Sequence, residues 1–410
     1  MKKRSPLPIL FVYVVVELLG YSLILPLLPY YAKTFGGTPL LIGLLGTSNA
    51  VAQIIGAPFI GRLSDRFGRR PLLILGISAS LVAFVMLGLA RSLTVILISR
   101  VVDGLLGGNI ALAQAYITDV TDEESRAKGL GIIGAAFGIG FIIGPATGGL
   151  LSQWGYAVPA FVAAGLCVLN LIWVLVSLPE SLTTERRSAL AVGPRHPITA
   201  RALFEALRRP KVGPLLRTRL LYSLAFGLFQ ANFALFALYR LGLQSQSTGY
   251  ILAYVGLLAV VVQGLAIGRL TVRFAEKQLV LAGVGVMAVA LLAWGLVPNV
   301  PLLLVVLAPL ALAGGTLNTV LNSLLTKSVA PDEVGGTLGL AAALQSLSGV
   351  VAPVAGGLLI QEIGPWSLGV VGALIMAWLF SFVWRHLVIS HDALAGGQPS
   401  SAQGSTRLQP

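Results

Sequence analysis

The stretch Gly61-Arg62-Leu63-Ser64-Asp65-Arg66-Phe67-Gly68-Arg69-Arg70 lies between two long apolar runs, residues 40–60 and 71–90. Each run has about the 20 apolar residues that a helix needs to cross a bilayer. The charged residues between them therefore predict a very short turn at one membrane face, joining two antiparallel spanning helices. Four arginines against one aspartate place the turn on the cytoplasmic side, where basic residues are enriched.

The composition of the whole chain indicates a membrane protein. Of its 410 residues 56% are hydrophobic and 10% are charged, and the mean hydropathy is +0.89, whereas soluble chains have about 25% charged residues. The first apolar run, residues 7–31, exceeds the roughly 7–15 residues of a signal-peptide core, so we expect a retained first span. The single cysteine, Cys167, can form no internal disulfide.

Twelve apolar runs are long enough to be spans. They fall near residues 7–31, 40–61, 71–90, 93–117, 129–153, 157–178, 214–239, 248–268, 278–297, 301–325, 336–360 and 366–388. With both termini in the cytoplasm, 24 of the 28 lysines and arginines are cytoplasmic; Lys33, Arg91 and Arg240 lie outside and Arg100 lies within a span. The net charge of +13 is then explained by topology and anionic lipid rather than nucleic acid, and we expect a location in the plasma (inner) membrane.

The spans divide six and six around a polar segment. The expected units are a first half (residues 1–178), a basic cytoplasmic linker (179–213), a second half (214–390) and a disordered tail (391–410). The last part of the linker, residues 203–209, suits either a short basic amphipathic helix on the membrane surface or a flexible charged connection.

The two halves resemble each other in sequence. Residues 61–70 match Gly268-Arg-Leu-Thr-Val-Arg-Phe-Ala-Glu-Lys at an offset of 207, and Pro145 aligns with Pro353 at an offset of 208 within a second match. Two matches at nearly one offset indicate an internal duplication. We therefore predict an all-α polytopic fold of two pseudo-symmetric six-helix halves, with a cavity at their interface near the midplane that rocking exposes to alternate sides.

Several motifs now resemble the major facilitator superfamily, and specifically its twelve-span drug/proton antiporter branch. Residues 61–70 resemble the superfamily signature between spans two and three, and residues 100–108 resemble its fourth-span motif. Residues 138–149 resemble the fifth-span antiporter motif. Residues 17–29, 119–126 and 256–263 resemble tetracycline/proton antiporters.

The resemblance implies proton-coupled export of small lipophilic or amphiphilic compounds, with the proton gradient as energy source and no cofactor. Tetracycline exporters carry a coupling histidine in span eight where this chain has Ala259, and acidic positions of their third and ninth spans fall near Ala83 and Met287. We therefore expect a related exporter, monomeric in the bilayer, with a different cargo.

Glu17 is the only charged residue of the first span and lies about 15 Å into it, near the midplane. A carboxylate is costly to ionise there, which suits a proton carrier; the alternative is a permanently protonated structural group. Arg100 and Asp103 are three residues apart on one helix face and are expected to pair, either as a static ion pair or as part of the proton path that the resemblance implies.

A conformational latch is expected at the cytoplasmic face. Its members are Gly61, Asp65, Arg66, Gly68, Arg69, Arg70, Asp119 and Arg126. Asp65 is predicted to pair with Arg126 in the outward-open state and to cap a helix nearby; the second-half copy has lost this pair, with Val272 and Val334 in its place. The arginines taken alone are explained as topology determinants.

Small residues of the fifth span form the antiporter motif, which we expect to allow close helix contact and bending, or simple close packing. They are Gly138, Gly140, Gly144, Pro145, Gly148 and Gly149.

Polar and aromatic groups within the spans are candidates for the cargo cavity, although each alone also suits an interhelical contact. They include Tyr21, Asn49, Gln53, Gln114, Gln230, Phe233, Gln263, Asn318 and Gln345. Amides and aromatics with one free acid suit neutral or monocationic amphiphiles rather than organic anions.

Other functions on the same fold stay open: transport of a metabolite, sugar or lipid, or a transport-dead receptor or assembly factor. An enzyme is not expected, because the chain has no phosphate-binding loop, no metal-ligand spacing and no nucleophile–His–acid set.

Overall fold

The computed structural model describes residues 6–107, 109–182, 200–330 and 333–389, and every regular element in these ranges is helical. Twelve segments of this part of the chain are long and apolar enough to cross a membrane, which confirms the expected fold class. The first six comprise α1 (Leu7–Ile24) with η1 (Leu25–Leu27) and α2 (Leu28–Thr34), α3 (Pro39–Phe67), α4 (Arg69–Gly88), α5 (Leu93–Leu106) with α6 (Asn109–Val120), α7 (Glu123–Leu151) with η2 (Ser152–Trp154), and α8 (Ala157–Ser177).

The second six spans follow the helix α10 (Ala200–Arg208). They comprise α11 (Gly213–Arg240), α12 (Ser245–Val261) with η3 (Val262–Ala266) and α13 (Ile267–Arg273), α14 (Glu276–Leu296), α15 (Val300–Lys327), α16 (Val334–Glu362), and α17 (Ser367–Val383) with η4 (Trp384–Ile389).

The outer surface of the helices is apolar. Large side chains such as Leu169, Val176, Val289 and Leu374 are more than 60% exposed. Water would penalise so much exposed apolar area, whereas lipid does not, and helices satisfy their backbone polar groups internally in lipid. The chain is a multi-pass membrane protein.

The turn between α3 and α4 is shorter than the sequence suggested. α3 continues through Phe67 and α4 begins at Arg69, so Gly68 is the one residue between them. Gly68 has a φ of 107°, a conformation that residues with a Cβ rarely adopt. Most of the charged cluster therefore lies on the last turns of α3 rather than in a loop.

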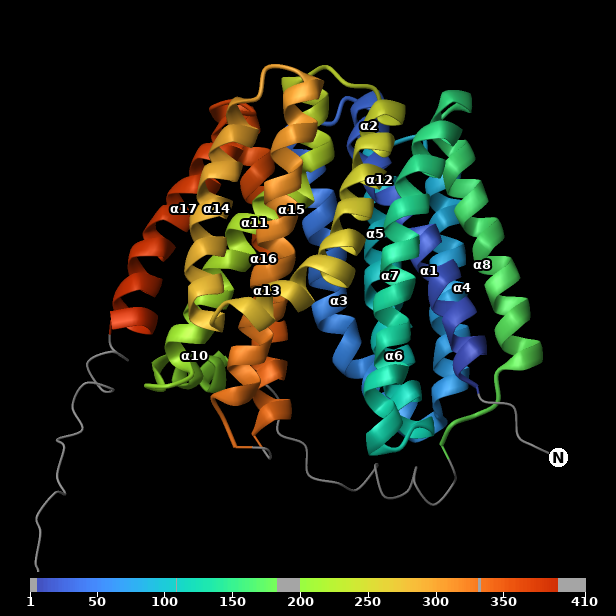
Figure 1. The fold of residues 1–410 in the computed structure, drawn as a ribbon. Helices are drawn as coiled ribbons and strands as arrows, with labels where there is room; N and C mark the ends of the chain where they lie inside the picture. The colour runs from blue at the N-terminus through green and yellow to red at the C-terminus, as the bar shows by residue number, and fades with distance from the viewer. Residues whose placement is uncertain (1–5, 108, 183–199, 331–332, 390–410) are drawn as a thin grey trace, which may run out of the picture.

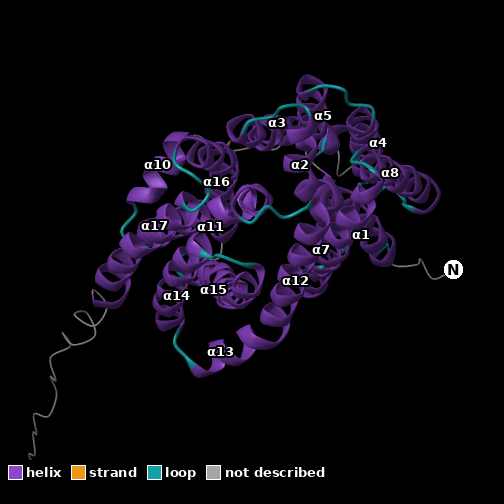
Figure 2. Ribbon diagram, turned by 90° about the horizontal axis from the view of Figure 1, so that it is seen from above, coloured by secondary structure: helices purple, strands orange, loops and turns teal. Residues whose placement is uncertain are grey.

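The halves meet through two pairs of helices, α7 with α12 and α3 with α16, which lie side by side in Figure 2. The Pro145 carbonyl of α7 lies against Gly249 of α12, and the Pro353 carbonyl of α16 lies against Gly43 of α3. The duplication relates Pro145 to Pro353 and brings Gly43 near Gly249, so the two contacts are copies of one another. This symmetry is what an internal duplication predicts.

The end of the molecule that lies opposite the two described chain ends is here called the distal end. Hydrogen bonds join the two halves there. Tyr30 Oη lies 2.5 Å from Thr248 Oγ1, and Ser152 Oγ lies 2.7 Å from Ser245 Oγ. Toward the other end, here the terminal end, the two sets of helices diverge (Figure 1). The protein is therefore held closed at its distal end.

The helix α10 ends at Arg208, so residues 203–208 are helical rather than a flexible connection, while their contact with the membrane surface stays a prediction. Its Ala206 belongs to a small apolar cluster with Leu216, Leu325 and Leu344 of the second half. Arg209, just after α10, forms an ion pair of 3.2 Å with Glu333. α10 is thus attached to the second half; the linker residues 183–199 and the tail expected to be disordered lie outside the described residues.

A cross-link across the distal end tests this closed arrangement. Ser152→Cys with Ser245→Cys places two sulfurs within disulfide reach, and the native Cys167 is buried. With a protease site inserted between residues 183 and 199, mild oxidation should keep the two cleaved halves together on a non-reducing gel.

The control pair is Lys128→Cys with Val272→Cys, on exposed positions near the terminal end of each half. This pair should cross-link far less. Equal cross-linking of both pairs would contradict a structure in which the halves touch at the distal end and are separated at the terminal end.

Candidate functional site

The Glu17 carboxyl is held inside the first half by an amide. Its Oε1 accepts a hydrogen bond of 2.5 Å from Asn109 Nδ2 on α6, whereas Oε2 is buried without a partner in the described part of the chain. The side chains of Asn170 and Ser80 also interact with this carboxyl, and the negative charge of Asp103 repels it. No arginine or lysine is among these neighbours, so ionised Glu17 would be an uncompensated charge.

The expected pair of Arg100 and Asp103 is confirmed, with Nη1 3.7 Å from Oδ2 and both side chains buried. Two further donors hold Asp103: Ser80 Oγ at 3.0 Å and Asn49 Nδ2 at 3.3 Å. Asn49 also donates to the Arg100 carbonyl oxygen at 2.9 Å. Asn49, predicted to face cargo, is therefore part of the network around Asp103.

These groups form one polar network across the helices of the first half. Asn170 Oδ1 is buried and without a hydrogen-bond partner among the described residues, which leaves an acceptor near the carboxyl, whereas Asn109 Oδ1 points toward Gly76. A protonated Glu17 has a hydroxyl to donate, whereas an ionised Glu17 does not. The surroundings of Glu17 therefore favour a carboxyl that takes up a proton.

Arg69 is the centre of the charged cluster at the terminal end. It is 8% exposed, its Nη1 lies 2.7 Å from Asp65, and its Nε lies 3.0 Å from Asp119 of α6. Arg69 also donates to Ser64 Oγ. Arg69, Asp65 and Asp119 thus lie together as the latch expectation requires, while the pairing of Asp65 with Arg126 in the outward-open state stays a prediction.

Helix α4 is capped by Glu180, while the capping of a nearby helix by Asp65 stays a prediction. Glu180 Oε1 accepts from the Arg69 backbone N–H at 2.8 Å, and Oε2 accepts from that of Arg70 at 3.2 Å. A carboxylate at a helix N-terminus satisfies unpaired N–H groups and offsets the helix dipole. The first residues of the linker are thereby fixed to the terminal end of the first half.

The small residues of the antiporter motif face two neighbours. A Cβ at Gly140, Gly144 or Gly148 would collide with Leu18, Ser22 or Leu23 of α1, respectively. A Cβ at Gly138 would lie 2.9 Å from Val260, and one at Gly149 would lie 3.0 Å from Gln246, both on α12. Helix α7 is therefore wedged between the Glu17 helix and the opposite half, as close packing by small residues allows.

Seven of the nine predicted cavity residues have exposed side chains, whereas Asn49 is half-buried and Phe233 is buried. The exposed ones are Tyr21, Gln53, Gln114, Gln230, Gln263, Asn318 and Gln345. Phe233 is only 1% exposed and contacts Phe229 edge-on, so it belongs to the core of the second half in this structure. The expectation that Phe233 lines a cavity is wrong for this state.

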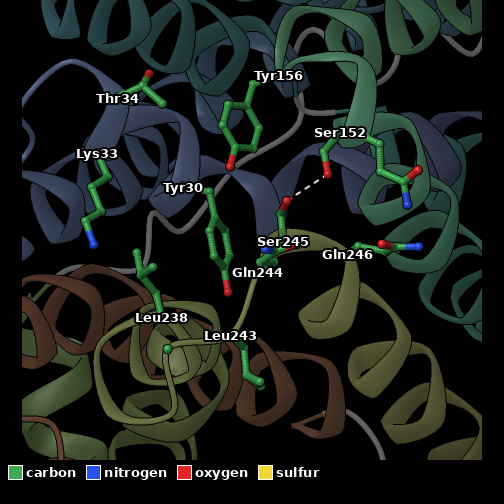
Figure 3. Close-up of a pocket in the computed structure, with 12 residues that line it drawn as sticks. Tyr30, Lys33, Thr34, Ser152, Tyr156, Leu238, Leu243, Gln244, Ser245 and Gln246 are labelled. Carbon is green, nitrogen blue, oxygen red and sulfur yellow. Dashed lines mark hydrogen bonds between the residues drawn. The ribbon is translucent and has the colours of Figure 1, made fainter.

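A polar cavity of about 490 Å³ lies between the halves at the distal end. Tyr30, Lys33 and Tyr156 line it from the first half, and Gln244 and Ser245 from the second; Figure 3 shows Ser152 bonded to Ser245 at its edge. The cavity is at the closed end rather than near Glu17, so it marks where the halves would part on opening outward.

Three residues were missed by the sequence analysis: Asn109, Glu180 and Arg219. Arg219 was counted among the cytoplasmic charges, yet it is 4% exposed within α11. The sequence indicates this burial through the position of Arg219, which lies six residues after the start of α11 and is followed by apolar residues.

Replacing Arg69 should destabilise the protein far more than replacing its neighbour Arg66. Arg69→Gln leaves two partly buried carboxylates without their shared cation, which costs about 3–5 kcal/mol in such networks. Arg66 is exposed over the Phe67 ring, so Arg66→Gln should have little effect. Thermal unfolding of the purified variants measures the difference, and equal melting temperatures would contradict this account of the cluster.

Comparison with known proteins agrees with this geometry. The model of the Major Facilitator Superfamily matches residues 10–271 and 240–403. Human solute carrier family 67 member A1 is 31% identical over 93% of this chain and 92% of its own length. The class H tetracycline resistance protein of Pasteurella multocida is 29% identical over 92% of this chain and 95% of its own length.

Solved structures show the same fold. A bacterial homologue of the human lysosomal transporter Spinster, in an inward-facing and occupied conformation, superposes with a TM-score of 0.77 at 16% identity, covering 98% of this chain and all of the other. The similar proteins are membrane transporters rather than enzymes. With its duplicated halves, interface glycines and charged turn, the chain belongs to the major facilitator superfamily.

Proposed function

We propose that the protein is a proton-coupled antiporter that exports small amphiphilic organic compounds by alternating access. The observation that carries this proposal is the Glu17 carboxyl, which lies within the first span. One of its oxygens is bonded to Asn109, and the other has no partner among the residues that the structure describes. Ionisable groups inside a membrane are costly and are most often functional. A carboxyl that gains and loses a proton is the simplest use of this arrangement.

In this mechanism Glu17 takes up a proton from the outside and releases it to the inside as the two halves alternate. Asp103 repels a negative charge on Glu17 and so couples the carboxyl to the Arg100 pair. Ser80 bonds to Asp103 and also interacts with Glu17, so it connects the two sites. The protonation state of Glu17 can then influence α1, which contacts the antiporter-motif glycines of α7.

Similarity to the tetracycline resistance protein of Pasteurella multocida supports export. The cargo is proposed to differ from tetracycline. The family's tetracycline exporters have a histidine and acids at three positions where this chain has Ala259, Ala83 and Met287. The proposal includes a monomer in the plasma (inner) membrane with both termini in the cytoplasm, driven by the proton gradient without a cofactor.

Proton flux in proteoliposomes tests the proposal. A pH-sensitive dye inside the vesicles should report proton movement when ethidium is added as a probe amphiphile under an imposed pH gradient. Glu17→Gln should reduce this movement at least tenfold, because the amide cannot exchange a proton. The protein should still bind ethidium.

The matched control is Glu362→Gln, which changes an exposed acid at the distal end of α16. It should leave the flux within about twofold of the unmodified protein. Ethidium transport that ignores the gradient, or that survives Glu17→Gln unchanged, would rule out coupling at Glu17.

A further inference from the structure

We propose that Arg219, Asn318 and Gln345 form a binding site for a carboxylate group of the cargo in the second half. The proposal rests on the proposed transport function and names a chemical class for what is carried. It starts from the charge of Arg219, which the proton mechanism does not use.

Arg219 is a buried cation without an acidic partner in the described ranges. Nη1 donates to Asn318 Oδ1 and Nη2 donates to Gln345 Oε1, both at 2.8 Å, and Nε is buried with no partner in the described part of the chain. Asn318 and Gln345 belong to α15 and α16 and are neutral. Tyr222 is the titratable side chain that interacts with the guanidinium electrostatically.

Among the described residues, the spanning helices of the second half hold no acid that could neutralise this charge. The sequence has no aspartate or glutamate in α11, α12, α13 or α15, and α14 and α16 have one each, Glu276 and Glu362, at their ends. Glu276 is occupied by Lys327 and Ser323 at 2.8 and 2.6 Å. An isolated charge inside a membrane protein costs free energy, so the site is built to receive an anion.

The amides of Asn318 and Gln345 direct their own hydrogen-bond donors away from Arg219. Because their oxygens accept from Arg219, their NH₂ groups point away from it, and both side chains are exposed. Neither amide nitrogen has a hydrogen-bond partner among the described residues. Two free donors backed by a guanidinium present a site that suits two carboxylate oxygens.

An aromatic surface lies on the same face of α11. Phe226 is seven residues after Arg219, two helical turns or about 10 Å along the helix, and is half-buried. Its ring stacks on Tyr222 with centroids 5.7 Å apart. A cargo with a carboxylate at one end and an aromatic body would contact the amides and Phe226 together. The site therefore extends the expected cargo, neutral or monocationic amphiphiles, to aromatic or lipophilic carboxylates.

Arg219 does not lie at the surface, where charges that determine topology are found. Arg217, two residues earlier, does lie there: it is exposed and donates to the Leu207 carbonyl oxygen of α10. Arg219 instead points into the second half. The pair supplies a matched control for any experiment on the site.

Binding of three indole compounds to the purified full chain in detergent tests the proposal. Indole-3-acetate, indole-3-acetamide and tryptamine share one aromatic body and carry negative, zero and positive charge. The unmodified protein should bind the acetate about tenfold more tightly than the acetamide, the scale of one charge-assisted hydrogen bond. Arg219→Gln should abolish the preference and Arg217→Gln should keep it.

The comparison in the unmodified protein alone can overturn the proposal, whatever the stability of Arg219→Gln. Equal affinity for acetate and acetamide, or no binding of the acetate, overturns it, and so does a preference that survives in folded Arg219→Gln. Because binding is measured without a pH gradient, a failure of proton coupling in vesicles leaves this result standing. Carboxylate binding without proton-coupled transport would count against the antiporter proposal alone.

Discussion

The backbone of each half comes close to that of the other at two symmetric places, and the rest of the structure depends on these contacts. The Pro145 carbonyl lies against Gly249 and the Pro353 carbonyl lies against Gly43, where a Cβ would have no room. Lipid gives no hydrophobic drive for helices to associate, so small residues that allow close approach must supply the contact. Because both contacts are made by small residues without buried charges, one half can turn against the other without breaking ion pairs.

Charged groups are accordingly kept inside each half. In the first half, Glu17, Arg100 and Asp103 share one network with surrounding amides and Ser80, and Arg69 binds the terminal ends of α3 and α6 together. In the second half, Arg219 is held by amides of α15 and α16. The duplication preserved the framework, but each half acquired its own charge: an acid in the first and a cation in the second. Under the two proposals, one half handles the proton and the other the anionic end of the cargo.

Much of the fold could be predicted from the sequence. Apolar run lengths predicted twelve spans, and the spacing of Arg100 and Asp103 predicted their pair, because both are local properties of one helix. The partners of Glu17 and Arg219 could not be predicted this way. Asn109 is 92 residues from Glu17, and Gln345 is 126 residues from Arg219, so only packing brings them together. Phe233 and Gln230 show the same limit: they share a helix, but the sequence did not reveal which of them is buried.

The central claim is that the halves move against each other about these glycine contacts, and distances between spin labels test it most directly. Phe67 and Phe274 are exposed near the terminal end, and Leu89 and Leu296 are exposed near the distal end; each pair is separated by the duplication offset of 207. Electron–electron resonance on both pairs, in lipid at acidic and alkaline pH, should show opposite changes: the distal pair lengthens when the terminal pair shortens. Distances that change together, or that stay fixed at both ends, would contradict the account.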